Sequence, residues 1–179
     1  KIVILSFFPF PKTFNSCSLE LISFINDDEV NLSSRDINQI ISDKCNLNYR
    51  IIWDCFVTDC ENMFISEDIL RALSACKKNN VLILITDNMD CFNRFTKNKL
   101  KLSDYFHYIF NSCDYGCLKD DPPQRGLFKK IIDLQGFNIQ KSVLLDNSQK
   151  NCDIFNHLGG SSFLIKDRHD IVSVLNMLE

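Results

Sequence analysis

The chain has 179 residues, 45% of them hydrophobic, with a formal net charge of −3 at pH 7 and a pI of about 5.6. This length suits one domain with a sizeable core, or a core with a small appendage. The lysines are scattered and form no basic stripe, which argues against a nucleic-acid or membrane-surface protein. The apolar run at residues 2–10 is too short to cross a bilayer and lacks a signal-peptide layout. We therefore expect a soluble, cytoplasmic protein.

The nine cysteines follow no metal-binding spacing. Their number is odd, no C-x-x-C pair occurs, and no paired histidines accompany them. We expect free thiols in a reducing compartment, many of them acting as small core hydrophobes. They are Cys17, Cys45, Cys55, Cys60, Cys76, Cys91, Cys113, Cys117 and Cys152.

Apolar strands and helices alternate along most of the chain. Continuous apolar runs predict buried strands at residues 1–5, 81–85, 108–111, 142–145 and 162–165. Helical patterns follow at residues 88–96, 121–135, 152–158 and 171–178. The second of these helices is expected to open at Asp121-Pro122-Pro123 and to stop at Gly136. This alternation predicts an α/β fold, with a Rossmann-like parallel sheet and helices on both faces.

Residues 14–76 break the alternation, because every pattern there is helical. Leu19 and Ile22 lie on the first helix, Ser33 or Ser34 caps the second, and Trp53 lies on the third. Ser66 is expected to cap the fourth. We interpret this stretch as a helical cap, inserted after the first strand into a core made of residues 1–13 and 77–179.

Polar residues follow each of the strands at which a ligand would bind. In open α/β sheets ligands bind beyond the carboxyl ends of the strands. Ser6 follows the first strand, Thr86 and Asp87 follow the second, and Asp146 follows the strand at 142–145. Lys119 precedes the helix that carries two prolines.

This order of motifs resembles the haloacid dehalogenase (HAD)-like superfamily. That family places Asp-x-Asp after its first strand, Ser or Thr after the second, Lys before a helix, and acidic residues after a later strand. The resemblance spans the chain and is strongest over residues 114–165, where Lys119 precedes the Asp146-Asn147-Ser148 segment and the glycines at 159–160. The insertion at 14–76 is similar to the small helical, C1-type cap of one subgroup.

The resemblance implies roles in phosphoryl transfer. Thr86 and Asp87 stand where the phosphate is bound, and Lys119 would neutralise its charge. Asp146 would be a ligand of Mg²⁺, which prefers hard oxygen ligands. Asn147 stands where many members carry a second acid, and an amide contributes no charge.

The first motif departs from the family pattern. Ser6 occupies the position of the aspartate nucleophile, and Phe8 that of the acid/base. We identify no general base for Ser6, and a hydroxyl is a weak nucleophile without one. Phe8 cannot transfer a proton. With Asp146 as the remaining carboxylate, we predict weak or absent metal binding, so that Mg²⁺ is expected only if the protein is an enzyme after all.

Structural alternatives exist for each of these residues. Lys119 is either a surface lysine or the partner of Asp146 in an ion pair. Thr86 is either a phosphate contact or, with Asp87, a helix N-cap. Asp146 is a metal ligand or part of a turn or cap cluster. For Asp87 and Asp90, we consider helix capping a better interpretation than a displaced Asp pair.

Three functions follow. The first is a catalytically inactive binding or regulatory module, whose partner is a small phosphorylated ligand or a protein rather than nucleic acid or membrane. The second is an active phosphatase or hydrolase on a small phosphorylated metabolite, which further carboxylates near Lys119 would favour. The third is a protein-interaction module that uses the cap and the apolar loop of Phe7, Phe8 and Phe10.

Overall fold

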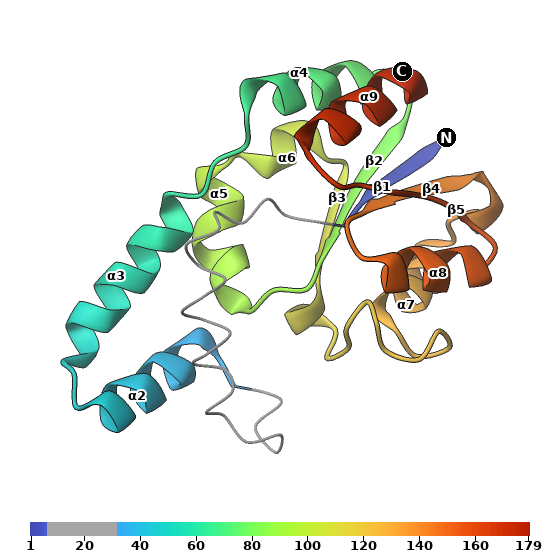
Figure 1. Cartoon of the computed structure of the whole chain (residues 1–179). Coiled ribbons are helices and arrows are strands. Elements are labelled where there is room, and N and C mark those ends of the chain that lie inside the picture. The colour runs from blue at the N-terminus through green and yellow to red at the C-terminus, as the bar shows by residue number, and fades with distance from the viewer. Residues whose placement is uncertain (7–31) are drawn as a thin grey trace. The chain divides into compact units, whose positions relative to one another are not determined.

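The computed structural model describes residues 1–6 and 32–179, which include a parallel five-stranded sheet (Figure 1). The strand order is β3-β2-β1-β4-β5, and every neighbouring pair is parallel. This confirms the predicted α/β class. The strands are β1 (Ile2–Leu5), β2 (Val81–Thr86), β3 (Tyr108–Asn111), β4 (Ser142–Asp146) and β5 (Ser161–Leu164).

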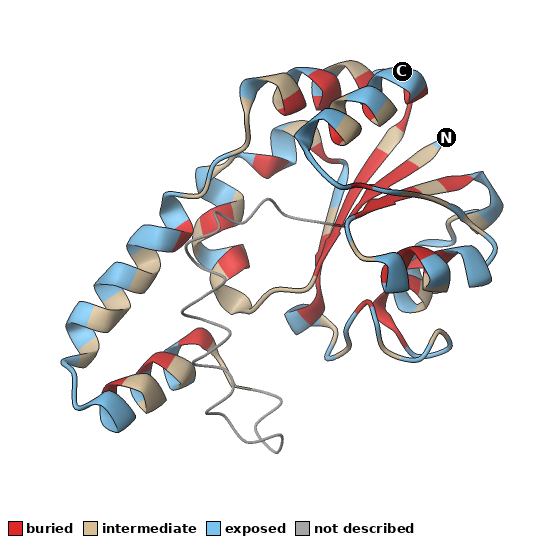
Figure 2. Cartoon of the chain, viewed as in Figure 1, coloured by how far each residue is buried: buried red, intermediate tan, exposed pale blue. Residues whose placement is uncertain are grey.

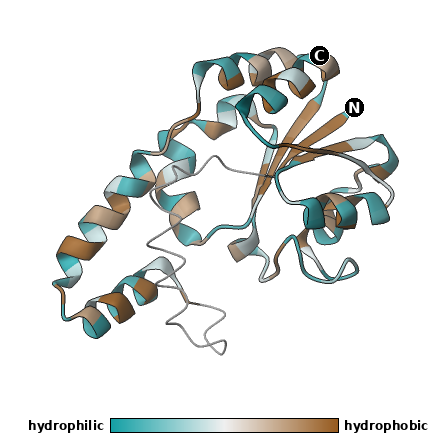
Figure 3. Cartoon of the chain, viewed as in Figure 1, coloured by the Kyte–Doolittle hydropathy of each residue, from teal (hydrophilic) through white to brown (hydrophobic). Residues whose placement is uncertain are grey.

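The strands β1, β2 and β4 are apolar because helices cover both faces of the sheet (Figure 3). On one face, Ile4, Ile83 and Leu144 form a buried cluster with side chains of α7 (Leu127–Gln135) and α8 (Gln149–His157). On the other face lie α4 (Glu67–Cys76) and α9 (Arg168–Leu178), which pack side by side (Figure 1). The central strands are therefore the most deeply buried part of the sheet (Figure 2).

The start of α7 differs from the prediction. The segment Asp121-Pro122-Pro123 forms a turn in which Arg125 and Gly126 donate backbone hydrogen bonds to the Pro122 carbonyl, and the helix begins only at Leu127. The expected opening at the prolines is wrong, because a residue that precedes proline is sterically disfavoured in the helical conformation. The end of the helix at Gly136 is confirmed, with φ +64° at that glycine.

The chain divides into two compact units. The first comprises Lys1–Phe8, Ile65–Asn88 and Lys101–Glu179, and contains the sheet, α4, α6 (Leu102–Tyr105), α7, α8 and α9. This division groups α4 with the sheet, whereas the sequence analysis assigned it to the cap. The cap itself, with its boundaries at 14 and 76, stays a prediction.

The second unit comprises Pro9–Phe64 and Met89–Leu100. Its described helices are α2 (Ser34–Cys45), α3 (Tyr49–Glu61), a π-helix (Phe92–Thr96) and α5 (Lys97–Lys99). Ser33 caps α2 in a reciprocal box with Asp36, as the capping prediction required. The first predicted helix, with Leu19 and Ile22, lies outside the described residues.

Local shorter elements complete the described chain. Single 3₁₀ turns lie at Ser112–Asp114 and Ile139–Lys141. Ser66 stands at the N-cap of α4, although its side chain makes no capping hydrogen bond to the helix. Within residues 1–6 and 32–179, no helix is long and apolar enough to cross a membrane.

Candidate functional site

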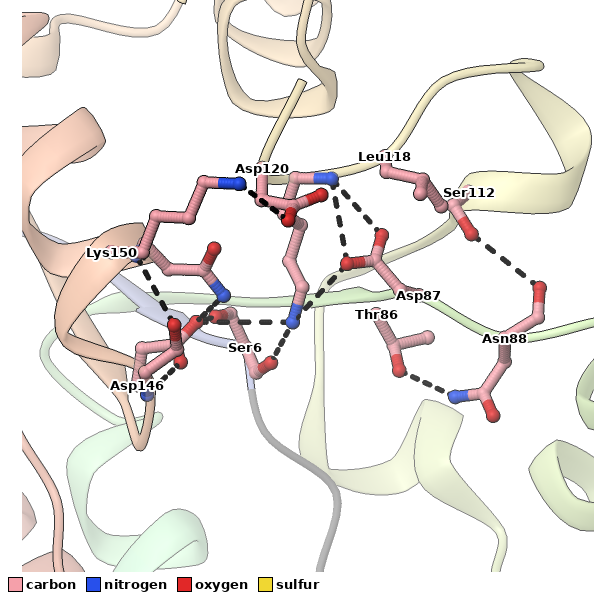
Figure 4. Close-up of polar contacts among 12 residues, drawn as sticks. Ser6, Thr86, Asp87, Asn88, Ser112, Leu118, Asp120, Asp146 and Lys150 are labelled. Carbon is pink, nitrogen blue, oxygen red and sulfur yellow. Dashed lines mark hydrogen bonds and ion pairs between the residues drawn. The ribbon is translucent and has the colours of Figure 1, made fainter. Parts of the chain in front are cut away.

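The candidate site lies where the carboxyl ends of β1, β2 and β4 meet. The parallel registry places Leu5 opposite both Leu84 and Leu145, so the residues that follow these strands share one edge of the sheet. Figure 4 shows Ser6, Thr86, Asp87 and Asp146 gathered at this edge.

Lys119 is the cation of the cluster and is only 7% exposed. Its Nζ donates a hydrogen bond to the backbone carbonyl of Ser6. The same nitrogen lies 3.8 Å from Oδ2 of Asp146 and 3.8 Å from Oδ2 of Asp87. The predicted Lys119–Asp146 ion pair is confirmed, and the alternative of a surface lysine is wrong.

Asp146 is completely buried, and donors surround its carboxylate. Oδ2 accepts hydrogen bonds from the Ser6 hydroxyl and, at 3.0 Å, from the Asn151 amide. Oδ1 accepts the Ser148 backbone N–H at 2.7 Å, and Ser148 in turn caps α8. Asp146 thus takes part in a turn and in the ion cluster at once. The sequence analysis found no general base for Ser6, and that expectation is wrong because the Asp146 carboxylate accepts the Ser6 hydroxyl.

Asp87 is the second carboxylate beside Lys119. Its Oδ1 and Oδ2 accept the Lys119 backbone N–H at 3.1 and 3.4 Å. The helix-capping interpretation is wrong for Asp87, because its carboxylate turns toward the loop of Lys119. Asp90 contacts a different helix from the one that follows it in the chain: within the second unit it accepts the Ser34 N–H at the start of α2, whose N-cap is Ser33, and it pairs with Arg94.

Thr86 is buried, and its side chain hydrogen-bonds outside the cluster around Lys119. Its hydroxyl oxygen accepts the Asn88 side-chain amide at 2.6 Å, and the Asn88 backbone N–H donates to the Asn111 side chain at 3.0 Å. No helix starts at Thr86, so the N-cap alternative is wrong. A phosphate contact by Thr86 stays a prediction.

The loop that carries Lys119 also makes polar contacts outside the cluster. Lys150 on α8 pairs with Asp120 at 2.8 Å (Figure 4). The Leu118 backbone N–H donates to Asp121 at 2.8 Å. Asn147 is exposed, and its backbone N–H donates to the Asp146 carboxylate. Phe8, with the rest of the apolar loop, lies outside the described residues.

Burial dominates the electrostatics of the two carboxyl groups. Desolvation raises the pKa of Asp146 above its ordinary value, although Lys119 and the surrounding N–H donors act in the opposite direction. Desolvation likewise raises the pKa of Asp87 against the charge of Lys119. Two acids that hold protons more tightly than usual therefore flank one ammonium group.

This arrangement predicts an unusual pH dependence of stability. Because the folded pKa of Asp87 is raised above the ordinary 3.8, its contribution to the free energy of unfolding is full at low pH and is lost as pH rises through the raised folded value. We expect Asp87→Asn to remove this decline. The free energy of unfolding of the variant, measured by urea denaturation, should therefore rise relative to that of the wild type between pH 4 and pH 7. Asp133→Asn, at an exposed residue paired with Lys129, is the control. Parallel wild-type and Asp87→Asn curves would contradict the assignment.

The residues present do not fit a Mg²⁺ site. Both oxygens of Asp146 accept hydrogen bonds, and Lys119 lies against both carboxylates where a cation would have to bind. Among the described residues, no three His, Cys, Asp or Glu side chains gather to hold a metal ion. Asn147 offers only an uncharged amide. The donor set therefore gives no basis for a metal-dependent step.

The fold is that of HAD-like hydrolases. A HAD family enzyme from Bacteroides thetaiotaomicron, solved with magnesium and inorganic phosphate, matches with a TM-score of 0.71 at 15% identity, covering 93% of this chain and 94% of its own. A predicted HAD-like family hydrolase from Porphyromonas gingivalis matches with a TM-score of 0.72 at 14% identity, covering 99% and 97%.

A third structure extends the comparison to a named subfamily. A HAD-superfamily hydrolase of subfamily IA from Geobacter sulfurreducens matches with a TM-score of 0.62 at 12% identity, covering 100% of this chain and 96% of its own. No protein-family model and no curated protein sequence matches this chain. At these identities the likeness establishes the fold alone.

Proposed function

We propose that this protein is a catalytically inactive binding or regulatory module built on the HAD-like hydrolase fold. The observation that carries the proposal is the state of Ser6, at the nucleophile position. Ser6 is fully buried, its hydroxyl donates to Asp146, and its carbonyl accepts from Lys119. The groups that phosphoryl transfer would need bind one another instead of a substrate.

The chemistry of a serine at this position supports the same conclusion. An aspartate nucleophile is already ionised at neutral pH, whereas a hydroxyl must lose a proton as it attacks. An in-line attack also requires the nucleophile to reach the phosphorus atom, and a fully buried Ser6 presents no surface to a substrate. Ser6 therefore serves as a hydrogen-bond donor that holds Asp146.

The ligand class that we propose is a small phosphorylated molecule, with Lys119 as its cationic contact and Thr86 as a hydroxyl contact. The solved enzyme from Bacteroides thetaiotaomicron, which holds inorganic phosphate, supports this class through the shared fold. Asp87 and Asp146 already face Lys119, and their charges oppose a phosphate dianion. We therefore expect weaker binding than at a site where the lysine is free.

One specific observation favours an active hydrolase as the second candidate. The Ser6 hydroxyl donates to a carboxylate whose pKa is raised, and two carboxylates lie near Lys119. In that case the Ser6 hydroxyl would attack phosphorus while the P–O bond to the substrate's alcohol breaks, and Lys119 would stabilise the equatorial oxygens. The Ser6 proton would pass to Asp146 and from there to the leaving alcohol oxygen, and water would then hydrolyse the phosphoserine to release phosphate. The burial of Ser6 is the argument against it.

Hydrolysis of an aryl phosphate, with and without Mg²⁺, separates the two candidates. We expect the wild type to show no turnover above Ser6→Ala, Asp146→Ala or Lys119→Ala. Lys150→Ala is the matched control, because Lys150 is an exposed lysine near the cluster. Circular dichroism establishes that each variant is folded. Turnover that is lost in Ser6→Ala, while Lys150→Ala retains it, would make the protein a serine-dependent hydrolase.

A further inference from the structure

Two cysteines from separate parts of the chain contact each other within the second unit. Cys60 lies near the end of α3, and Cys91 directly precedes the π-helix. Their side chains share a hydrogen bond, and both thiols are free. Because α4 and β2 lie between them in the chain, tertiary packing and not sequence proximity brings the two sulfur atoms together.

Further contacts hold α3 against the π-helix around this thiol pair. The Thr96 hydroxyl donates to the backbone carbonyl of Cys60 at 3.1 Å. The rings of Trp53 and Phe95 meet edge to face, with centroids 6.0 Å apart. Cys91 and Thr96 are five residues apart and both contact Cys60, as the i→i+5 spacing of a π-helix allows. The proximity of the two thiols is therefore part of a packed contact between two helices.

The hydrogen bond between the thiols makes them chemically unequal. It lowers the pKa of Cys60, although burial and the charge of Asp59 act in the opposite direction. The same hydrogen bond, together with burial, raises the pKa of Cys91. Cys60 is therefore the first of the two to become a thiolate, which is the nucleophilic form, and Cys91 keeps its proton and donates it to that sulfur. Cys91 is half-buried, so the pair reaches the surface on its side.

We propose that Cys60 and Cys91 form a redox-active dithiol, which a peroxide oxidises to a disulfide and a small dithiol such as dithiothreitol reduces again. The Cys60 thiolate attacks one oxygen of hydrogen peroxide, the O–O bond breaks, and a sulfenic acid forms while hydroxide takes up a proton and leaves as water. The Cys91 sulfur then attacks the sulfenic sulfur, and the displaced hydroxyl leaves with the Cys91 proton as a second water. The two thiols lose two electrons and two protons in total, and peroxide is reduced to two molecules of water.

The disulfide would join the two chain segments that make up the second unit. Cys60 belongs to Pro9–Phe64, and Cys91 belongs to Met89–Leu100. Closing residues 60–91 into a loop removes conformational freedom from the unfolded chain. We therefore expect the oxidised protein to unfold at a temperature about 5–10 °C above that of the reduced protein. This inference concerns a different part of the chain from the proposed binding function and does not depend on it.

The test is oxidation of the whole reduced chain with hydrogen peroxide, followed by blocking of the remaining thiols with N-ethylmaleimide. Tryptic digestion and mass spectrometry without reductant should then find the peptide of residues 51–71 joined to that of residues 79–94. Cys55→Ser is the matched control, because it removes an exposed cysteine of the same helix and leaves Cys60 as the cysteine of the first peptide. It should form the same bond. Cys60→Ser and Cys91→Ser should lose both the joined peptides and the rise in unfolding temperature, and dithiothreitol should reverse both in the wild type.

Each other result overturns the proposal. If N-ethylmaleimide blocks both Cys60 and Cys91 after oxidation, the pair is not redox-active. Joined peptides that disappear in Cys55→Ser would place the bond at the exposed cysteine of α3. A rise in unfolding temperature that persists in Cys91→Ser would come from oxidation elsewhere in the chain. Cys91 is half-buried, whereas Cys60 is buried, so Cys91→Ser keeps the test decisive if Cys60→Ser fails to fold.

Discussion

Replacing Lys119 by methionine should lower the free energy of unfolding by about 3–5 kcal/mol, the largest effect that we expect from one charged residue. Removing one partner of a buried ion pair leaves an uncompensated buried charge. Here the substitution leaves two carboxyl groups without their cationic partner, because Lys119 lies 3.8 Å from both Asp87 and Asp146. Methionine keeps the length and apolar stem of the side chain, so the loss reports mainly on charge and hydrogen bonding.

Urea denaturation measures the free energy of unfolding, and two further sets of variants serve as controls. Lys150→Met removes the other lysine of this region, but its side chain is 64% exposed and its pair with Asp120 should contribute no more than about 1 kcal/mol. Adding Asp87→Asn and Asp146→Asn to Lys119→Met removes the unpaired charges and should recover much of the loss. A Lys119→Met variant no less stable than Lys150→Met would show that the charge cluster does not stabilise the fold.

The sheet could be predicted from the sequence because its signal is local. Continuous apolar runs mark β1, β2 and β4, whose residues are buried on both faces, and all five strands lie where these runs predict them. The end of α7 was equally local, since Gly136 adopts a left-handed conformation that favours glycine. The start of α7 was predicted wrongly, because the Pro122-Pro123 pair imposes a turn before the helix.

The partners within the site depended on geometry that the sequence pattern does not contain. The ion pair between Lys119 and Asp146 followed from the order of strand ends. The hydrogen bond from the Lys119 backbone N–H to Asp87 depends on how a loop folds over the edge of the sheet. Asn151 was also missed, although a helix that begins after Ser148 turns this residue back toward Asp146.

The same edge of the sheet gives the buried cluster a structural function. Parallel strands bring polar residues together whether or not they react, and burial makes unpaired groups costly. Once Ser6 stands at the nucleophile position, its hydroxyl and carbonyl satisfy Asp146 and Lys119. The hydrogen bonds and ion pairs of this cluster therefore stabilise the fold whether or not the site binds a ligand.

Replacing Gly160 by alanine should destabilise the protein by about 2–3 kcal/mol, although the change adds a single methyl group. A Cβ at this position would collide with the Phe155 ring, lying 2.6 Å from its Cδ1 atom. Phe155 has no room to yield, since it is fully buried and meets Phe128 edge to face with centroids 5.5 Å apart. Overpacking of this kind costs about 1–3 kcal/mol in well-packed cores.

A double-mutant cycle isolates that collision from other effects of the substitution. Phe155→Leu removes the ring, so Gly160→Ala should cost at least 1 kcal/mol less in the Phe155→Leu background than in the wild type. Gly136→Ala is the control: a Cβ there meets open space, and its cost of about 1–2 kcal/mol comes from the left-handed backbone alone. That cost should be the same with Phe155 or Leu at the ring position. Urea denaturation measures the free energy of unfolding of each variant. If the losses caused by Gly160→Ala and Phe155→Leu are additive, the backbone shifts to admit the methyl group. The close approach of β5 to α8 would then not be what requires a glycine at position 160.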